Sequence, residues 1–152
     1  MVFRRCEMIR VGIINVTGYA GAELARLLYA HPEARLVSVS GRSAAGQPLA
    51  EVFPHLVCYD LTVEPEIGEV DFVFSALPHA ASAEAVAPLV RAGLPVVDIS
   101  ADFRLRDPQE YAAWYGGGHP APEMPDLEST MMSGPMIPAL TAGARASSAP
   151  SG

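Results

Sequence analysis

The chain has 152 residues, half of them hydrophobic and 18% charged, which is typical of a globular protein and enough for one domain with its own core. The formal net charge of −7, without a basic cluster beyond Arg4 and Arg5, argues against nucleic-acid binding. No apolar run approaches the roughly 20 residues that cross a bilayer, and the basic start lacks the apolar core of a signal peptide. We therefore expect a cytoplasmic protein without membrane association.

The order of the predicted elements indicates the fold class. Apolar or alternating runs favour strands, whereas apolar residues at i, i+3 and i+4 favour a helix. In chain order these patterns predict a strand at 9–15, a helix at 19–31, a strand at 34–40, a weaker edge strand at 56–63, a strand at 70–76, a helix at 79–93 and a strand at 95–100. Strands that alternate with helices pair in parallel through right-handed crossovers, so we expect an α/β fold, a Rossmann-like doubly wound sheet.

The first helix is predicted to pack through a face of leucines. Leu24, Leu27 and Leu28 follow the helical spacing, and Pro32 ends the segment because proline cannot continue the hydrogen-bond ladder.

The segment INVTGYAGAEL, residues 14–24, joins the first strand to this helix through small residues. A pyrophosphate is bound by backbone N–H groups at the positive end of a helix dipole, and glycines let the backbone come close. Gly18 and Gly21 fill the later positions of a G-x-x-G-x-x-G pattern, and Asn15, a residue type that tolerates positive φ, fills the first. The turn alone fits a dinucleotide site or an ordinary strand–helix connection. The cofactor-binding residues predicted here are Asn15, Thr17, Gly18, Tyr19, Ala20 and Gly21.

The replacement of the first glycine leads to an expectation of its own. Because glycine is usual at this position, Asn15→Gly is expected to keep or improve cofactor binding, unless the asparagine side chain itself contacts the ligand.

The loop after the second predicted strand, SGRSAAG at 40–46, carries the next signal. In NAD-binding folds an acidic residue about 20 positions after the glycines binds the ribose 2′-hydroxyl, whereas a nearby arginine suits a 2′-phosphate. This loop has no acid, and Arg42 lies between Ser40 and Ser43. The sequence therefore favours NADP as cofactor; the alternative is an arginine in a solvated loop.

A further group of candidates, in the segment SALPH at 75–79, stands at the C-terminal end of the strand predicted at 70–76. The carboxyl ends of parallel strands line the ligand crevice of an open α/β sheet. Ser75, Leu77 and Pro78 are therefore predicted to bind the cofactor, with Pro78 and His79 beside the nicotinamide. His79 fits either the same crevice or a helix start exposed to water.

Five segments together resemble N-acetyl-γ-glutamyl-phosphate reductases: TGYAGAEL, GRSAAGQPLAEVFPHL, SALPHAAS, VVDISADFRLRD and WYGGGHPAPE. DISADFRL followed by HPAPE is the most specific part, and the resemblance covers about residues 8–123. It implies an NADP-dependent oxidoreductase of arginine biosynthesis. In such enzymes a cysteine thiolate displaces phosphate from an acyl phosphate, and NADPH reduces the thioester to the 5-semialdehyde.

The resemblance has further implications for substrate, assembly and site residues. It implies a small-molecule acyl-phosphate substrate, no metal, and homo-oligomers among the full-length enzymes. It places Asp102, Arg104 and His119 near the substrate side. For Asp102 and Arg104 the alternative is a local ion pair, which contributes under about 1 kcal/mol when exposed.

The catalytic part of the family pattern is missing from this sequence. The family's cysteine nucleophile lies in an NPGCYPT-like segment farther along, and its partner histidine lies later still; neither is present. Cys6 and Cys58 lack CxxC spacing and are predicted to be reduced, with structural or incidental roles. We therefore predict no catalytic residue in this chain, which should be inactive alone.

Residues 124–152 differ in composition from the rest. They hold four of the six methionines, and 17 of these 29 residues are Ala, Gly, Pro or Ser. We expect a disordered tail outside the family, produced by a frameshift or a gene-prediction error. The predicted organisation is a disordered extension at 1–7, an NADP-binding domain at 8–123 and this tail. Two alternatives stay open: a non-catalytic NADP-binding module, and the product of a disrupted gene.

Overall fold

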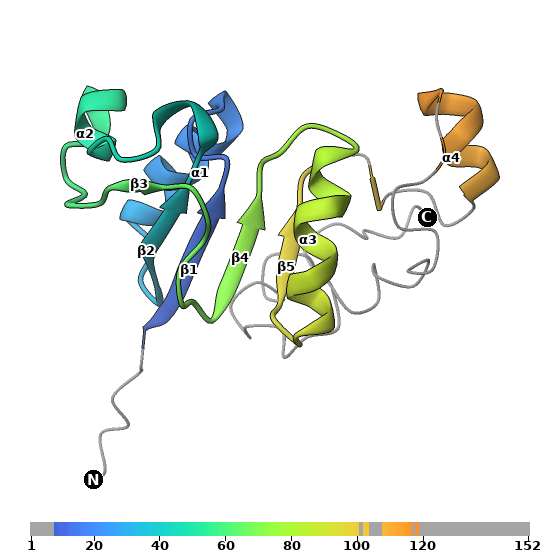
Figure 1. Ribbon diagram of the computed structural model, residues 1–152. Helices are drawn as coiled ribbons and strands as arrows, with labels where there is room; N and C mark the ends of the chain where they lie inside the picture. The colour runs from blue at the N-terminus through green and yellow to red at the C-terminus, as the bar shows by residue number, and fades with distance from the viewer. Residues whose placement is uncertain (1–7, 101, 104–107, 117, 119–152) are drawn as a thin grey trace, which may run out of the picture.

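The computed structural model describes residues 8–100, 102–103, 108–116 and 118, and Figure 1 shows helices on both faces of one sheet. The strand order is β3-β2-β1-β4-β5, and each neighbouring pair is parallel. The strands and α-helices are β1 (Ile9–Ile14), α1 (Tyr19–Tyr29), β2 (Ala34–Ser40), α2 (Leu49–Val52), β3 (Val63–Glu64), β4 (Phe72–Ser75), α3 (Ala81–Arg91), β5 (Val96–Asp98) and α4 (Pro108–Tyr115). The chain builds outward from β1 to β3 and then returns to the other side of β1. This order confirms the predicted doubly wound α/β fold.

Different helices cover the two faces of the sheet. Ile13 of β1 packs in one buried cluster with Ala25 and Leu28 of α1. Val73 of β4 packs in a second cluster with Val86 of α3. Because successive residues of a strand point to opposite faces, an apolar strand can supply both clusters, which explains the apolar run at 72–74.

The edge strand predicted at 56–63 is wrong for most of its length. β3 contains only Val63–Glu64, and Pro54–Leu56 forms a 3-10 helix instead. Leu56 and Val63 are both fully buried in the cluster against α1, so their apolar character reflects core packing rather than one continuous strand. The prediction that this strand lies at a sheet edge is confirmed.

The leucine face predicted for α1 is also partly wrong. Leu27 is 56% exposed, whereas Gly21, Ala25 and Leu28 are buried. Gly21, Ala25 and Leu28 follow the i, i+4, i+7 spacing of one helix face, and Leu27 lies about 100° around the helix from Leu28, toward solvent. α1 and α3 are also shorter than the predicted helices at 19–31 and 79–93.

Several predictions lie outside the described residues. These are the extension at 1–7, the tail at 124–152, and the candidates Arg104 and His119. Within the described part of the chain, no helix combines the length and the apolar character needed to cross a membrane.

Candidate functional site

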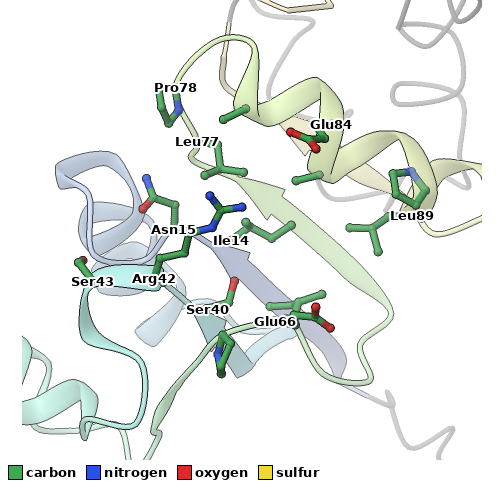
Figure 2. Close-up of a pocket in the computed structure, with 16 residues that line it drawn as sticks. Ile14, Asn15, Ser40, Arg42, Ser43, Glu66, Leu77, Pro78, Glu84 and Leu89 are labelled. Atoms are coloured by element: carbon green, nitrogen blue, oxygen red, sulfur yellow. The ribbon is translucent and has the colours of Figure 1, made fainter. Parts of the chain in front are cut away.

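A cleft of about 710 Å³ lies at the carboxyl ends of β1, β2 and β4. The strand order reverses between β1 and β4, and ligands of open α/β sheets bind at such a point. In Figure 2, Arg42 reaches from the loop after β2 toward Asn15 and Ile14, while Leu77 and Pro78 lie across the cleft. Six predicted cofactor residues line the cleft: Asn15, Ser40, Arg42, Ser43, Leu77 and Pro78.

The turn between β1 and α1 has the backbone conformation that its sequence favours. Asn15 has a φ of 63°, the left-handed conformation that asparagine tolerates better than most residues. The backbone N–H of Gly18 donates to the Asn15 carbonyl at 3.2 Å, which closes the turn. Gly18 then begins α1 without any side-chain cap, so the first N–H groups of the helix face no competing side chain there.

Gly21 allows α1 to lie against the end of β1. A Cβ atom at this position would come within 2.4 Å of the Asn15 carbonyl oxygen and within 2.7 Å of the Val16 Cα. Both neighbours are backbone atoms that no side-chain rotation can move. Gly21 is therefore required for helix–strand packing, and it does not line the cleft.

Hydrogen bonds join the Asn15 side chain to two neighbouring loops. Its Nδ2 donates to the Ala76 carbonyl at 2.9 Å, at the end of β4. Its Oδ1 accepts from the Thr17 hydroxyl at 3.3 Å, and Thr17 in turn accepts from the Ser43 hydroxyl at 3.3 Å. Thr17 itself does not line the cleft.

Three charged side chains line the described part of the cleft. Arg42 was predicted, whereas Glu66 and Glu84 were missed. Glu66 follows β3, and Glu84 lies in the first turn of α3. Position after a strand was the available signal for Glu66, since the strand predicted at 56–63 ends only one residue before β3 does. Glu84 could be assigned to the cleft only once α3 was known to lie over it.

Ser75 lies in a buried network behind the cleft and does not line it. Its Oγ is 2.6 Å from the Ser82 Oγ, and the Ser82 hydroxyl donates to Asp98 Oδ1 at 2.6 Å. Because the Ser82 proton is used on the carboxylate, the Ser75 hydroxyl must be the donor in the first bond. Asp98 also accepts from the backbone N–H and hydroxyl of Ser100. The network connects β4, α3 and β5.

The remaining predicted residues lie away from the cleft lining. The side chains of Tyr19 and Ala20 are exposed at the start of α1, Tyr19 almost completely. Asp102 is fully buried, and its two oxygens accept from the backbone N–H groups of Ala80 at 2.7 Å and Ala83 at 2.9 Å. Cys58 is an exposed free thiol outside the lining. The described residues contain no cluster of His, Cys, Asp and Glu suited to a metal ion.

Comparisons with known proteins agree with this geometry. An N-acetyl-gamma-glutamyl-phosphate reductase of Dehalococcoides mccartyi is 55% identical over 116 residues, which is 76% of this chain and 34% of that protein. The corresponding protein of Ruegeria pomeroyi is 50% identical over 119 residues, again 75% of this chain and 34% of the relative. The match therefore spans about a third of the length of these relatives.

Solved structures show the same fold. Aspartate semialdehyde dehydrogenase with NADP from Candida albicans has a TM-score of 0.55 at 22% identity, over 75% of this chain and 41% of that chain. Aspartate semialdehyde dehydrogenase II complexed with ASA from Vibrio cholerae has a TM-score of 0.54 at 17% identity, over 64% of this chain and 32% of that chain. The family described as "Semialdehyde dehydrogenase, NAD binding domain" matches residues 10–138. The chain therefore belongs to the semialdehyde dehydrogenase family, of which it contains the NAD-binding domain.

Proposed function

We propose that the cleft binds NADP(H), and that this chain is the cofactor-binding part of an N-acetyl-γ-glutamyl-phosphate reductase. The observation that carries this proposal is the position of Arg42 between Ser40 and Ser43 on one wall of the cleft, beside the β1–α1 turn. The Arg42 guanidinium provides several donors for a 2′-phosphate and the Ser40 hydroxyl a further one, and residues 40–46 include no carboxylate that would repel it. The 55% identical reductase supports the choice of reaction.

The turn before α1 is proposed to bind the pyrophosphate. The N–H groups in the first turn of a helix have no partner within the helix, and the helix dipole adds positive potential. Tyr19 and Ala20 can donate through their backbones although their side chains point to solvent. In this proposal Gly18 keeps the approach to those groups open, and Leu77 and Pro78 contact the nicotinamide end.

The proposed reaction of the whole protein is reductive dephosphorylation. A cysteine thiolate displaces phosphate from N-acetylglutamyl 5-phosphate, and hydride from NADPH converts the thioester into the aldehyde and regenerates the thiolate. Cys58 does not line the cleft, so the described residues account for cofactor binding and not for acyl transfer. The chain alone is therefore proposed to bind the cofactor without turning over substrate.

The finer organisation is part of the same proposal. We place the domain at residues 8–123, between an extension and a tail, in a cytoplasmic protein whose full-length form assembles into homo-oligomers. Asp102, Arg104 and His119 stay proposed for the substrate side, although the buried Asp102 carboxylate could act there only through the backbone that it holds.

Binding of NADP⁺ and NAD⁺ to the complete 152-residue chain tests the cofactor proposal. Calorimetric titration and thermal melting should give at least about tenfold tighter binding of NADP⁺, with a matching rise in melting temperature. Arg42→Gln should remove most of this preference and change NAD⁺ affinity by no more than about twofold. Arg35→Gln, at an exposed arginine outside the cleft, is the matched control. Equal affinity for both dinucleotides, or no effect of Arg42→Gln, would contradict the role of Arg42.

A further inference from the structure

We infer that Asn15 is a positioning residue whose side chain holds three loops around the cleft in register, so that both phosphate groups of the cofactor are bound as one unit. The inference rests on the proposed binding of NADP(H). The loops follow β1, β2 and β4, and the residues that connect them are Ser43, Thr17, Asn15 and Ala76, called here the Asn15 hydrogen-bond chain.

On the β4 side, the Asn15 hydrogen-bond chain fixes the beginning of the loop that leads to α3. Asn15 Nδ2 donates to the Ala76 carbonyl at 2.9 Å, and the Ala76 N–H donates to the Ile14 carbonyl at 3.0 Å. Ala76 is therefore bound to the end of β1 through both of its backbone groups. The next two residues, Leu77 and Pro78, line the cleft, so the Asn15 amide sets the position from which they enter it.

On the β2 side, the Asn15 hydrogen-bond chain reaches the loop that contains Arg42. Ser43 Oγ donates to Thr17 Oγ1, and Thr17 Oγ1 donates to Asn15 Oδ1, each at 3.3 Å. All the donors point the same way along the chain, so each bond polarises the next. The Ser43 side chain is thereby held next to Arg42 with its one proton on Thr17, so the Arg42 guanidinium is the donor left for the proposed 2′-phosphate, while Asn15 lies at the proposed pyrophosphate turn.

The backbone around Asn15 supports a role for its side chain. A φ of 63° costs more for asparagine than for glycine, and the hydrogen bonds of the Asn15 side chain, which a glycine lacks, offset this cost. A Cβ at position 18 would lie 3.2 Å from Asn15 Nδ2, which shows that the turn folds closely around this amide. Gly18 leaves room for the amide group between the loops.

This geometry reverses the expectation that Asn15→Gly keeps or improves cofactor binding. The glycine would relax the backbone but break the connection between the loops. We expect Asn15→Gly to weaken NADP⁺ binding about tenfold, or about 1.4 kcal/mol. The melting temperature of the unliganded chain should change little, since the relaxed backbone offsets the lost hydrogen bonds.

Thr17 lies outside the cleft lining, so a change of its hydroxyl alters the Asn15 hydrogen-bond chain without removing a lining side chain. Thr17→Val removes the hydroxyl and keeps the side-chain shape. Contacts of 3.3 Å are longer than the usual O–H···O range of about 2.5–3.0 Å, so each bond is weak and we expect only about threefold weaker NADP⁺ binding. Thr17→Ser retains the hydroxyl and should restore the affinity. Thr62→Val, at an exposed threonine outside the lining, is the matched control.

The experiment measures dinucleotide affinity together with amide hydrogen exchange of the unliganded chain. The expected result is faster exchange at residues 76–80 in Asn15→Gly and Thr17→Val, and a reduced ratio of NADP⁺ to NAD⁺ affinity in both. The double variant should bind about as weakly as Asn15→Gly alone, because both changes break one connection. A general loss of folding would lower the melting temperature without changing the affinity ratio.

Two results would overturn the inference. If Thr17→Val behaves like the parent while Asn15→Gly loses affinity, the bonds through Thr17 and Ser43 position nothing, and the inference that Asn15 holds three loops together is wrong. Unchanged exchange and affinity in both variants would exclude a positioning role altogether. If the parent protein binds neither dinucleotide, the proposed function is wrong. The exchange data then test the Asn15 hydrogen-bond chain independently: faster exchange in the variants supports it, and unchanged exchange overturns it.

Discussion

The carboxylate of Asp102 lies at the N-terminus of α3, where it accepts hydrogen bonds from the backbone N–H groups of Ala80 and Ala83. A negative charge at a helix N-terminus is favourable, and these N–H groups have no partner within the helix. Asp102→Asn replaces one acceptor oxygen with a donor that faces an N–H group. We expect a loss of about 2–3 kcal/mol in the free energy of unfolding, measured by urea denaturation.

The control for Asp102→Asn is the same change at Asp60, whose side chain is exposed. That variant should stay within about 0.5 kcal/mol of the parent. Equal stability of the Asp102 variant and the control would mean that the two backbone bonds contribute nothing beyond what water provides.

Single residues were the hardest level to predict from the sequence. Ser75 ends β4 and Asp102 follows β5, and a side chain at such a place can face a ligand or the end of a helix. Only the folded chain shows that Asp102 faces α3 and that Ser75 donates to Ser82. The left-handed φ of Asn15 was foreseeable from its residue type, whereas its bond to Ala76, 61 residues away, was not.

At the level of elements, Gly21 determines how closely α1 packs on β1. An added methyl group would meet the Asn15 oxygen at 2.4 Å and the Val16 Cα at 2.7 Å, so the whole helix would have to move. We expect Gly21→Ala to lower the free energy of unfolding by about 2–3 kcal/mol, despite the better helix propensity of alanine. Cofactor affinity should fall as well, because the phosphate-binding turn moves with the helix. Urea denaturation and NADP⁺ titration measure the two effects.

Gly68→Ala is the matched control for Gly21→Ala. A Cβ at Gly68 would approach Ser38 Oγ no closer than 3.4 Å, an ordinary contact. This variant should be neutral or more stable by up to about 1 kcal/mol, since alanine restricts the unfolded chain. If Gly21→Ala is equally well tolerated, α1 is not held by close packing at this point.

The elements were predictable where their pattern was long and regular. β1, β2, α1 and α3 all have lengths and spacings that one period explains. The segment 56–63 misled the prediction because Leu56 and Val63 are buried by tertiary packing and not as neighbours in one strand. Leu27 shows the opposite case, an apolar residue with helical spacing that close helix packing leaves exposed.

At the level of the whole molecule, the alternation of strands and helices was enough to predict the sheet and the edge at which the cleft lies. Turn residues from three separate loops could be assigned to the cleft because carboxyl ends of parallel strands meet at one edge. Glu66 and Glu84 were missed because their place in the cleft depends on how the β3 loop and α3 lie over that edge. Chain order alone does not contain that information.

Tyr59 connects the segment after α2 to α1 and makes the stability of the whole molecule sensitive to alkaline pH. Its hydroxyl donates to the Ala25 carbonyl at 2.8 Å, and its ring lies edge-on to Tyr29 with centroids 5.8 Å apart. Burial raises the pKa of Tyr59 to about 12, and electrostatic interactions with Cys58 and Tyr29 contribute in the same direction. The folded state therefore retains a proton that the unfolded tyrosine releases near its usual pKa of about 10.

The sign of the pH dependence follows from this difference in proton binding. Below about pH 10 both states are protonated and the contribution of Tyr59 is complete; between about pH 10 and 12 the unfolded state binds fewer protons, so stability falls as pH rises. Tyr59→Phe should lower the free energy of unfolding by about 1 kcal/mol at pH 8, because the hydrogen bond is lost. It should also reduce the loss of stability between about pH 10 and 12 by about 1 kcal/mol, a small amount because the partly exposed phenol is screened by solvent. Urea denaturation from pH 8 to 12 measures both, and absorbance at 295 nm should show one tyrosine fewer titrating late in the variant. Parallel decline of the parent and the variant would mean that Tyr59 loses its proton equally easily in the folded and unfolded chains.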